Sequence, residues 1–218
     1  MEKTVIQAHR GASAYAPENT LPSFQLAVDM GADGIECDIH LSRDGKFVVC
    51  HDHTVNRTSN GTGEISALSL EEIKALDFGA KFNPKYAGTP APTLEEMLDV
   101  VRGMKVINIE IKRFEHAMGL NASLDLFYSI LQQYEIIGKT IVSSFDKLAL
   151  RRLKQLHPDV YTCLLYDKMK SPAATAQKLG CSAIHPYYGF LSKRTVNSAH
   201  ARKLKVNCWT VDDADEIA

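Results

Sequence analysis

The sequence predicts an α/β fold built on a parallel sheet, and two observations support this. Apolar segments of strand length alternate with helical segments along most of the chain, which is typical of parallel strands covered by helices. The 218 residues are 45% hydrophobic and 23% charged, which is enough for one sizeable core. We therefore expect a single domain over residues 1–218.

Local sequence signals predict the helices and strands in order along the chain. Asn19 or Thr20 can cap the first helix and Gly31 can close it, while Thr93 and Glu96 form a capping box for another. Helices are expected at 20–30, 93–103, 123–137, 146–156, 171–180 and 192–203. Parallel strands are expected at 5–11, 34–42, 106–112, 140–145, 161–166, 182–187 and 206–211.

Two features interrupt this alternation. Asp44-Gly45 is a two-residue hairpin signal, so residues 47–51 should fold back antiparallel on the preceding strand. Opposed residue numbers would then sum to about 89, which places His51 opposite Asp38. Residues 53–92 are rich in Thr, Asn, Gly and Pro around one short helix started by Ser69, and we expect a small insertion there.

Seven parallel strands are one fewer than a (β/α)8 barrel contains. The chain stops at Ala218, inside a helix expected after Asp213. Because closing a barrel removes exposed sheet edges, we expect that a last strand and helix of about 20 to 30 residues are missing. A doubly wound open sheet is the alternative.

Composition excludes several classes of partner. A formal net charge of -1 and a pI near 6.7 create no long-range field for nucleic acid or an anionic membrane. No apolar run of about 18 residues and no signal peptide is visible, so we expect no transmembrane segment and a cytoplasmic location. The five scattered cysteines are expected to be mostly buried thiols. The oligomeric state is left open.

Carboxylates share faces of two predicted strands. Glu36 and Asp38 alternate with apolar residues on one strand, and Glu110 lies between Asn108 and Lys112 on another. Three carboxylates at strand ends repel one another unless a cation neutralises them, and all-oxygen ligands favour Mg²⁺ or Ca²⁺. The alternative is pairing with basic side chains, which is stronger for Glu110 because Lys112 shares its face.

His9 and His51 are the candidate acid and base, because imidazole can give and accept a proton near neutral pH. Arg10 and Lys112 could hold a phosphate, or could instead neutralise the carboxylates. The remaining six histidines are expected to be structural: His40, His53, His116, His157, His185 and His200.

An ordered series of motifs resembles the glycerophosphodiester phosphodiesterase family. It runs from residue 9 to residue 211 and consists of His9-Arg10-Gly11, Pro17-Glu18-Asn19-Thr20, Glu36-Cys37-Asp38, Asp44-Gly45 leading to His51-Asp52, Arg57-Thr58-Ser59-Asn60-Gly61, Asn108-Ile109-Glu110-Ile111-Lys112, Ser143-Ser144-Phe145 and Trp209-Thr210-Val211. An ordered string of this kind is far more specific than any one of its pieces.

The resemblance implies a metal-dependent (β/α)8 phosphodiesterase with an insertion after the second strand. It would hydrolyse glycerophosphodiesters, a small-molecule substrate class, to sn-glycerol 3-phosphate and an alcohol. The resemblance makes His9 and His51 the general acid and base, and it makes Glu36, Asp38 and Glu110 the ligands of one Mg²⁺ or Ca²⁺ ion. Arg10 and Lys112 would contact the phosphate, and Phe145 and Trp209 would line the mouth of the site.

Three other functions remain open at this point. One is a phospholipase-like phosphodiesterase that releases a cyclic phosphate, another is a noncatalytic phosphodiester-binding barrel, and the third is a metal-dependent aldolase or enolising barrel. The last of these does not require the histidine pair. The sequence does not indicate which alcohol leaves, which cation binds, or whether water or a glycerol hydroxyl is the nucleophile.

Overall fold

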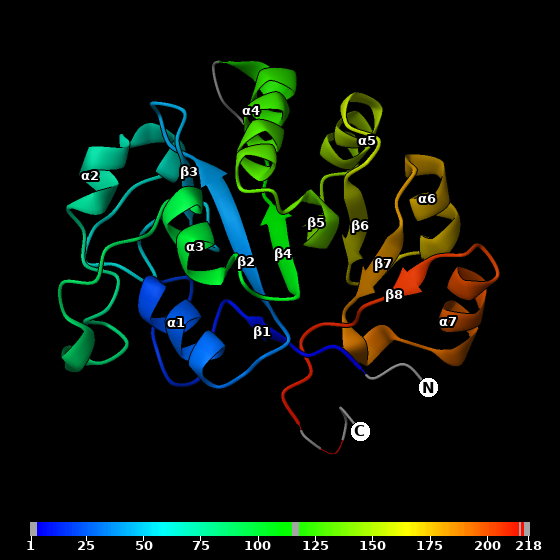
Figure 1. Ribbon diagram of the computed structural model, residues 1–218, viewed down its shortest axis with the longest axis horizontal. Helices are drawn as coiled ribbons and strands as arrows, with labels where there is room; N and C mark the ends of the chain where they lie inside the picture. The colour runs from blue at the N-terminus through cyan, green and yellow to red at the C-terminus, as the bar shows by residue number, and fades with distance from the viewer. Residues whose placement is uncertain (1–3, 115–117, 214, 216–218) are drawn as a thin grey trace. The chain divides into compact units, whose positions relative to one another are not determined.

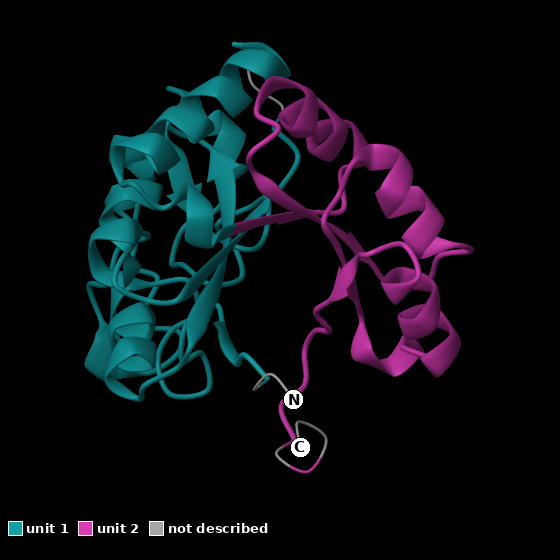
Figure 2. Cartoon of the chain, turned by 45° about the vertical axis from the view of Figure 1, so that its right-hand side comes forward, with its two compact units in different colours: residues 1–140 teal, residues 141–218 magenta. Residues whose placement is uncertain are grey.

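The structure is a computed structural model that describes residues 4–114, 118–213 and 215 (Figure 1). The chain divides into two compact units, residues 1–140 and residues 141–218, which Figure 2 colours separately. In both units parallel strands alternate with helices, as the sequence predicts. The helix expected after Asp213 falls almost entirely on residues outside the described ones.

The first unit is built around one central strand. Strand β2 (Gly34–Leu41) runs parallel to β1 (Gln7–His9) and to β4 (Val106–Ile111), and β3 (Phe47–Val49) pairs with it antiparallel. Helices α1 (Leu21–Asp29) and α3 (Leu94–Val101) pack against each other. Alternate residues of β2 and β4 are apolar and fully buried, and they form one face of the sheet: Ile35, Cys37, Ile39, Ile107, Ile109 and Ile111.

The register of the hairpin between β2 and β3 differs from the prediction by one residue. Ile39 is paired with Val49, so paired residue numbers sum to 88 and not to 89. The backbone N–H of Cys50 donates to the carbonyl of Asp38 at 3.0 Å. Cys50 therefore lies opposite Asp38, and the predicted pairing of His51 with Asp38 is wrong.

The length of the turn explains this shift. The N–H of Ser42 donates to the carbonyl of Lys46 at 2.9 Å, which leaves three residues in the loop instead of two. Gly45 takes a φ of +74°, the left-handed conformation that a three-residue hairpin requires at its last position. The Asp-Gly pair is thus part of the turn, but it does not form a two-residue turn alone.

The predicted insertion lies between β3 and α3. It contains the 3-10 helices η1 (Ile65–Ala67) and η2 (Pro84–Tyr86) and the helix α2 (Leu70–Lys74), which begins with the expected capping box of Ser69 and Glu72. A small apolar cluster joins this segment to β3, and its buried members are Val48, Cys50, Val55, Ile65, Ile73, Phe78 and Ala91.

The second unit continues the alternation of strands and helices. Its parallel strands are β5 (Thr140–Ser144), β6 (Tyr161–Tyr166), β7 (Ala183–Pro186) and β8 (Lys205–Val206). Helices α5 (Lys147–Leu156), α6 (Pro172–Leu179) and α7 (Lys193–His200) follow the first three of them. The predicted last strand is shorter than expected, since β8 covers only two residues.

Helix α4 (Gly119–Gln133) lies four residues before its predicted position. Ser123, which we expected near the start, is buried inside the helix, and its hydroxyl donates to the carbonyl of Gly119 at 3.0 Å. The helix ends early because Glu135 takes a φ of +56°, and the chain continues as the 3-10 helix η3 (Ile137–Lys139). A buried serine bonded to its own helix does not cap it.

The described residues contain seven parallel strands, as predicted. None of their helices combines the length and the apolar character that a membrane crossing demands. Four of the five cysteines are buried thiols, as expected, and Cys208 is exposed.

Candidate active site

The register of the first unit aligns polar side chains from three adjacent strands. His9 of β1 is level with Glu36 of β2, and Glu36 is level with Asn108 of β4. Two residues further along, Asp38 is level with Glu110. Because side chains alternate along a strand, all five belong to the face opposite the apolar core residues. Parallel pairing therefore produces the cluster that residue spacing predicts.

The three carboxylates are close enough to share one cation. Glu36, Asp38 and Glu110 each offer an oxygen, and these oxygens lie within 4.8 Å of one another. Burial raises the pKa of Glu36 well above its usual range, and the charges of Asp38 and Glu110 raise it further. Burial also raises the pKa of Glu110, to about 7. Burial and the neighbouring carboxylates therefore disfavour the ionised forms of Glu36 and Glu110.

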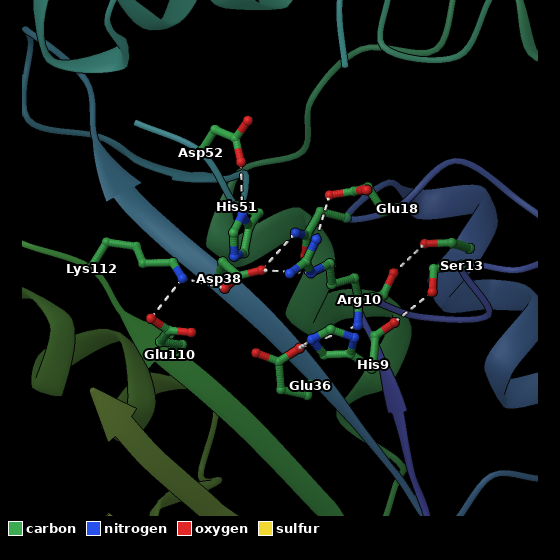
Figure 3. A network of polar contacts seen from close by, with 12 residues as sticks. His9, Arg10, Ser13, Glu18, Glu36, Asp38, His51, Asp52, Glu110 and Lys112 are labelled. Carbon is green, nitrogen blue, oxygen red and sulfur yellow. Dashed lines mark hydrogen bonds and ion pairs between the residues drawn. The ribbon is translucent and has the colours of Figure 1, made fainter. Parts of the chain in front are cut away.

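Lys112 partly balances this charge. Its ammonium group lies 2.8 Å from Oδ1 of Asp38 and 2.6 Å from Oε1 of Glu110 (Figure 3). Burial alone would raise the pKa of Asp38, but Lys112 holds it down to about 2. The expected alternative, in which Lys112 neutralises carboxylates, is thus present for two of the three acids.

Arg10 follows β1 in a tight turn. Its φ is +58°, and its N–H donates to the carbonyl of Glu36 at 2.9 Å. Gly11 follows with a φ of +80°, and a Cβ there would lie 2.4 Å from the hydroxyl oxygen of Ser23. Only glycine fits this approach of β1 to helix α1. The turn directs the guanidinium group of Arg10 toward the carboxylates (Figure 3).

The Arg10 side chain lies between two acidic groups. Its Nη1 donates to Oε1 of Glu18 at 3.0 Å, and its Nε lies 3.7 Å from Oδ2 of Asp38. The amide of Asn19 donates to the same Asp38 oxygen at 2.8 Å. Both Glu18 and Asn19 come from the loop before α1, so this loop orients Asp38 and Arg10 together.

The two candidate histidines lie at the border of this cluster. Nε2 of His9 is 3.8 Å from Oε2 of Glu36, and 32% of the His9 side chain is exposed. Nδ1 of His51 is 2.7 Å from Oδ1 of Asp52, and 34% of the His51 side chain is exposed. Each imidazole thus pairs with a carboxylate and still reaches solvent.

Sequence reasoning gave no catalytic or binding role to several residues of this network. Asp52 accepts hydrogen bonds from Nε and Nη2 of Arg57, at 2.8 and 3.1 Å. His40 lies on the carboxylate face of β2, and its Nε2 is 3.1 Å from the carbonyl of His51. Burial lowers the pKa of His40 to about 4, so it is neutral and supports His51, in line with the structural role expected for it. Glu18, Asp52 and Arg57 belong to the motifs quoted above. Their membership in these motifs was the one sequence signal that could have indicated a functional role.

Phe145 and Trp209 belong to the second unit. Phe145 directly follows β5, and its ring centroid lies 5.9 Å from that of Trp209, edge to face. Tyr187 also contacts Trp209, with ring centroids 5.4 Å apart. The substrate role of Phe145 and Trp209 stays a prediction. His116 lies outside the described residues.

Comparisons with known proteins agree with the motifs and the geometry. The sequence pattern of the glycerophosphoryl diester phosphodiesterase family matches residues 9–218. A glycerophosphodiester phosphodiesterase of Caldanaerobacter subterraneus subsp. tengcongensis is 37% identical, over 99% of this chain and 88% of that protein. A glycerophosphodiester phosphodiesterase of Bacillus subtilis strain 168 is 33% identical, over 99% of this chain and 79% of its own length.

A solved structure is similar in fold over almost the whole chain. The phosphodiesterase of Oleispira antarctica, in complex with the product sn-glycerol-3-phosphate, has a TM-score of 0.89 and 31% identity. The match covers 98% of this chain and 87% of that chain. The fold and the comparisons thus define a phosphodiesterase of the (β/α)8-barrel class. The chain belongs to the glycerophosphoryl diester phosphodiesterase family, and the predicted family, fold class and enzyme class are confirmed.

Proposed function

We propose that this protein hydrolyses glycerophosphodiesters to sn-glycerol 3-phosphate and an alcohol, using one divalent cation and two histidines. The observation that carries the proposal is the cluster of Glu36, Asp38 and Glu110, with His9 and His51 at its border. The product bound by the Oleispira antarctica phosphodiesterase supports sn-glycerol 3-phosphate as one product.

The carboxylate cluster fits a hard cation such as Mg²⁺ or Ca²⁺. Its three ligand atoms are oxygens within 4.8 Å of one another, and burial raises the pKa values of Glu36 and Glu110, so that a cation beside them would favour their ionised forms. When bound, a cation there would supply Lewis-acid stabilisation of the charge that develops on the phosphoryl oxygens. Glu36, Asp38 and Glu110 are the residues that would hold it.

Arg10 and Lys112 are placed to bind the phosphate group. Both side chains are mostly buried and approach Asp38, Lys112 as a point charge and Arg10 through its planar fork. Buried cations stabilise charge in the transition state more strongly than exposed ones, because water screens them less. We assign both residues to the nonbridging oxygens of the substrate.

The two histidines would move the protons. Asp52 accepts a hydrogen bond from the N–H at Nδ1 of His51, which leaves Nε2 of that ring to exchange a proton with the substrate. One imidazole removes the proton from the nucleophile while the other gives a proton to the oxygen of the leaving alcohol. In sum, the nucleophile bonds to phosphorus, and the bond from phosphorus to the alcohol oxygen breaks.

The direct test measures sn-glycerol 3-phosphate released from a panel of glycerophosphodiesters carrying choline, ethanolamine, inositol or glycerol. We expect release that a chelator abolishes and that Mg²⁺ or Ca²⁺ restores. Accumulation of a cyclic phosphate would instead indicate attack by the neighbouring glycerol hydroxyl. Binding without any turnover across the panel and both cations would contradict the proposal.

A further inference from the structure

A continuous series of hydrogen bonds and ion pairs joins His51 to Arg10 within the first unit. His51 contacts Asp52, Asp52 accepts from Arg57, Arg57 donates to Glu18, and Glu18 also accepts from Arg10. Figure 3 shows both ends of this series, at His51 with Asp52 and at Arg10 with Glu18. The two arginines of the series alternate with the carboxylates of Asp52 and Glu18. Arg57 is its middle member and comes from the insertion.

Arg57 binds both neighbouring carboxylates with two nitrogens each. Nε and Nη2 donate to the two oxygens of Asp52 at 2.8 and 3.1 Å. Nη1 and Nη2 donate to the two oxygens of Glu18, both at 2.8 Å. A planar guanidinium group with two bidentate partners fixes the orientation of both, which a lysine could not do.

The contact has a consequence for the charge of Asp52. The hydrogen bonds from Arg57 hold the pKa of this carboxyl well below its usual range, and the bond to His51 adds to this. Asp52 is thus a fixed anion whose oxygen accepts from Nδ1 of His51. A fixed anion at Nδ1 sets which ring nitrogen carries the proton and where Nε2 points.

We infer that Arg57 is a positioning residue that orients His51 through Asp52. Glu18 connects Arg57 to Arg10. The inference rests on the proposed function. The insertion therefore contributes to the site as well as to packing. Glu18 accepts hydrogen bonds from both Arg10 and Arg57. It therefore fixes the position of Arg10 relative to the pair of His51 and Asp52. A substitution at either Glu18 or Arg57 should weaken the same interaction.

The test compares Arg57→Gln, Arg57→Lys and Glu18→Gln with the control Arg43→Gln. Arg43 is a suitable match because it is also exposed and also pairs with a glutamate, Glu72, at 3.0 Å. For Arg57→Gln we expect kcat to fall about 10- to 100-fold with KM nearly unchanged. Arg57→Lys should recover only part of the loss, and Arg43→Gln should retain the activity of the natural protein.

A second readout does not depend on turnover. In protein labelled with ¹⁵N-histidine, the proton on Nδ1 of His51 should exchange slowly enough to give an NMR signal, which His51→Gln assigns by its absence. We expect this signal to disappear in Arg57→Gln and to persist in Arg43→Gln. If the His51 signal is present in the natural protein and lost in Arg57→Gln, but no glycerophosphodiester is hydrolysed, the proposed function fails while the positioning role of Arg57 stands.

The pair of substitutions at Glu18 and Arg57 provides a further check. If both act through one network, the double variant should lose about as much kcat as the worse single variant. If Arg57→Gln does not fold, Glu18→Gln and Arg57→Lys still report on the same series. The inference is overturned if kcat and the His51 signal are both unaffected in the folded variants, or if the losses simply multiply.

Discussion

The two units carry different chemistry on and just after their strands. In the first unit, β1, β2 and β4 carry the ionisable residues His9, Glu36, Asp38 and Glu110, and the three carboxylates are largely buried. In the second unit, β5 and β7 lead directly into aromatic side chains, among them Phe145 and Tyr187. Within the described residues, the single group of three potential metal ligands belongs to the first unit.

The buried histidine of the second unit sharpens this contrast. His185 of β7 is 3% exposed, and burial lowers its pKa to about 3. Its Nε2 accepts from the amide of Asn207 at 2.7 Å, so the ring is a neutral acceptor in a neutral surrounding. The comparison shows that burial alone is enough to keep a histidine neutral, and so to prevent it from exchanging protons near neutral pH. A histidine that exchanges protons needs both a charged partner and access to solvent, as His9 and His51 have.

The largest expected effect concerns the two histidines of the first unit. His9→Ala and His51→Ala should each reduce kcat by about 100- to 10,000-fold, because each removes one proton-transfer group. His185→Gln, in the second unit, should leave kcat within about twofold of the natural protein, since its ring exchanges no proton near neutral pH. Steady-state assays on a substrate from the panel measure all three. Near-normal turnover in either alanine variant would refute the role assigned to that histidine.

The next effect concerns the carboxylates. Cation at about 100 times its Kd should stabilise the folded protein by about 2.7 kcal/mol, which raises Tm. Glu110→Gln removes one charged ligand and should lose most of this rise. Glu72→Gln, at an exposed acid in the insertion, should keep it. Thermal unfolding with and without cation makes the comparison, and an equal rise in all three proteins would argue against a cation site at Glu110.

A smaller effect is expected from the aromatic pair of the second unit. Phe145→Ala and Trp209→Ala should each raise KM by about 2- to 10-fold, the cost of losing one aromatic contact with the substrate. Cation-linked stabilisation should not change, because neither residue is a ligand. Kinetics and thermal unfolding of the same preparations separate the two properties. An unchanged KM in both variants would remove these residues from the substrate site.

The smallest effect is on stability in acid. The unfolded chain protonates His185 near pH 6.5, whereas the folded protein resists protonation until about pH 3. Stability is therefore highest above pH 6.5 and falls as pH decreases through this interval, by about 2 kcal/mol between pH 7 and pH 5 from this residue. His185→Gln should flatten that decline in urea unfolding, while exposed His200→Gln should not. Parallel declines in all proteins would show that His185 does not titrate on unfolding.

Sequence reasoning succeeded where local signals and strand periodicity decide the outcome. The alternation on β2 and β4 was enough to group Glu36, Asp38 and Glu110, because parallel register then aligns them. The capping boxes at Ser69 and Thr93 were placed correctly for the same local reason. The order of strands and helices follows from these signals.

Sequence reasoning failed where contacts between residues distant in the sequence decide the local structure. The turn at Asp44-Gly45 has one residue more than predicted, so Cys50 and not His51 lies opposite Asp38. Arg57 and Glu18 are 39 positions apart, and no periodicity links an insertion residue with the loop before α1. The roles of such residues depend on tertiary contacts. The quoted motifs therefore contain Glu18 and Arg57, but sequence reasoning gave them no role.

The central claim is that one divalent cation is held by Glu36, Asp38 and Glu110. A crystal grown with Mn²⁺ tests it most directly, because anomalous scattering locates this ion independently of the protein atoms. We predict one strong peak within coordination distance of all three carboxylates, with His9 and His51 at its border. A peak elsewhere in the first unit, or none at saturating Mn²⁺, would contradict the account.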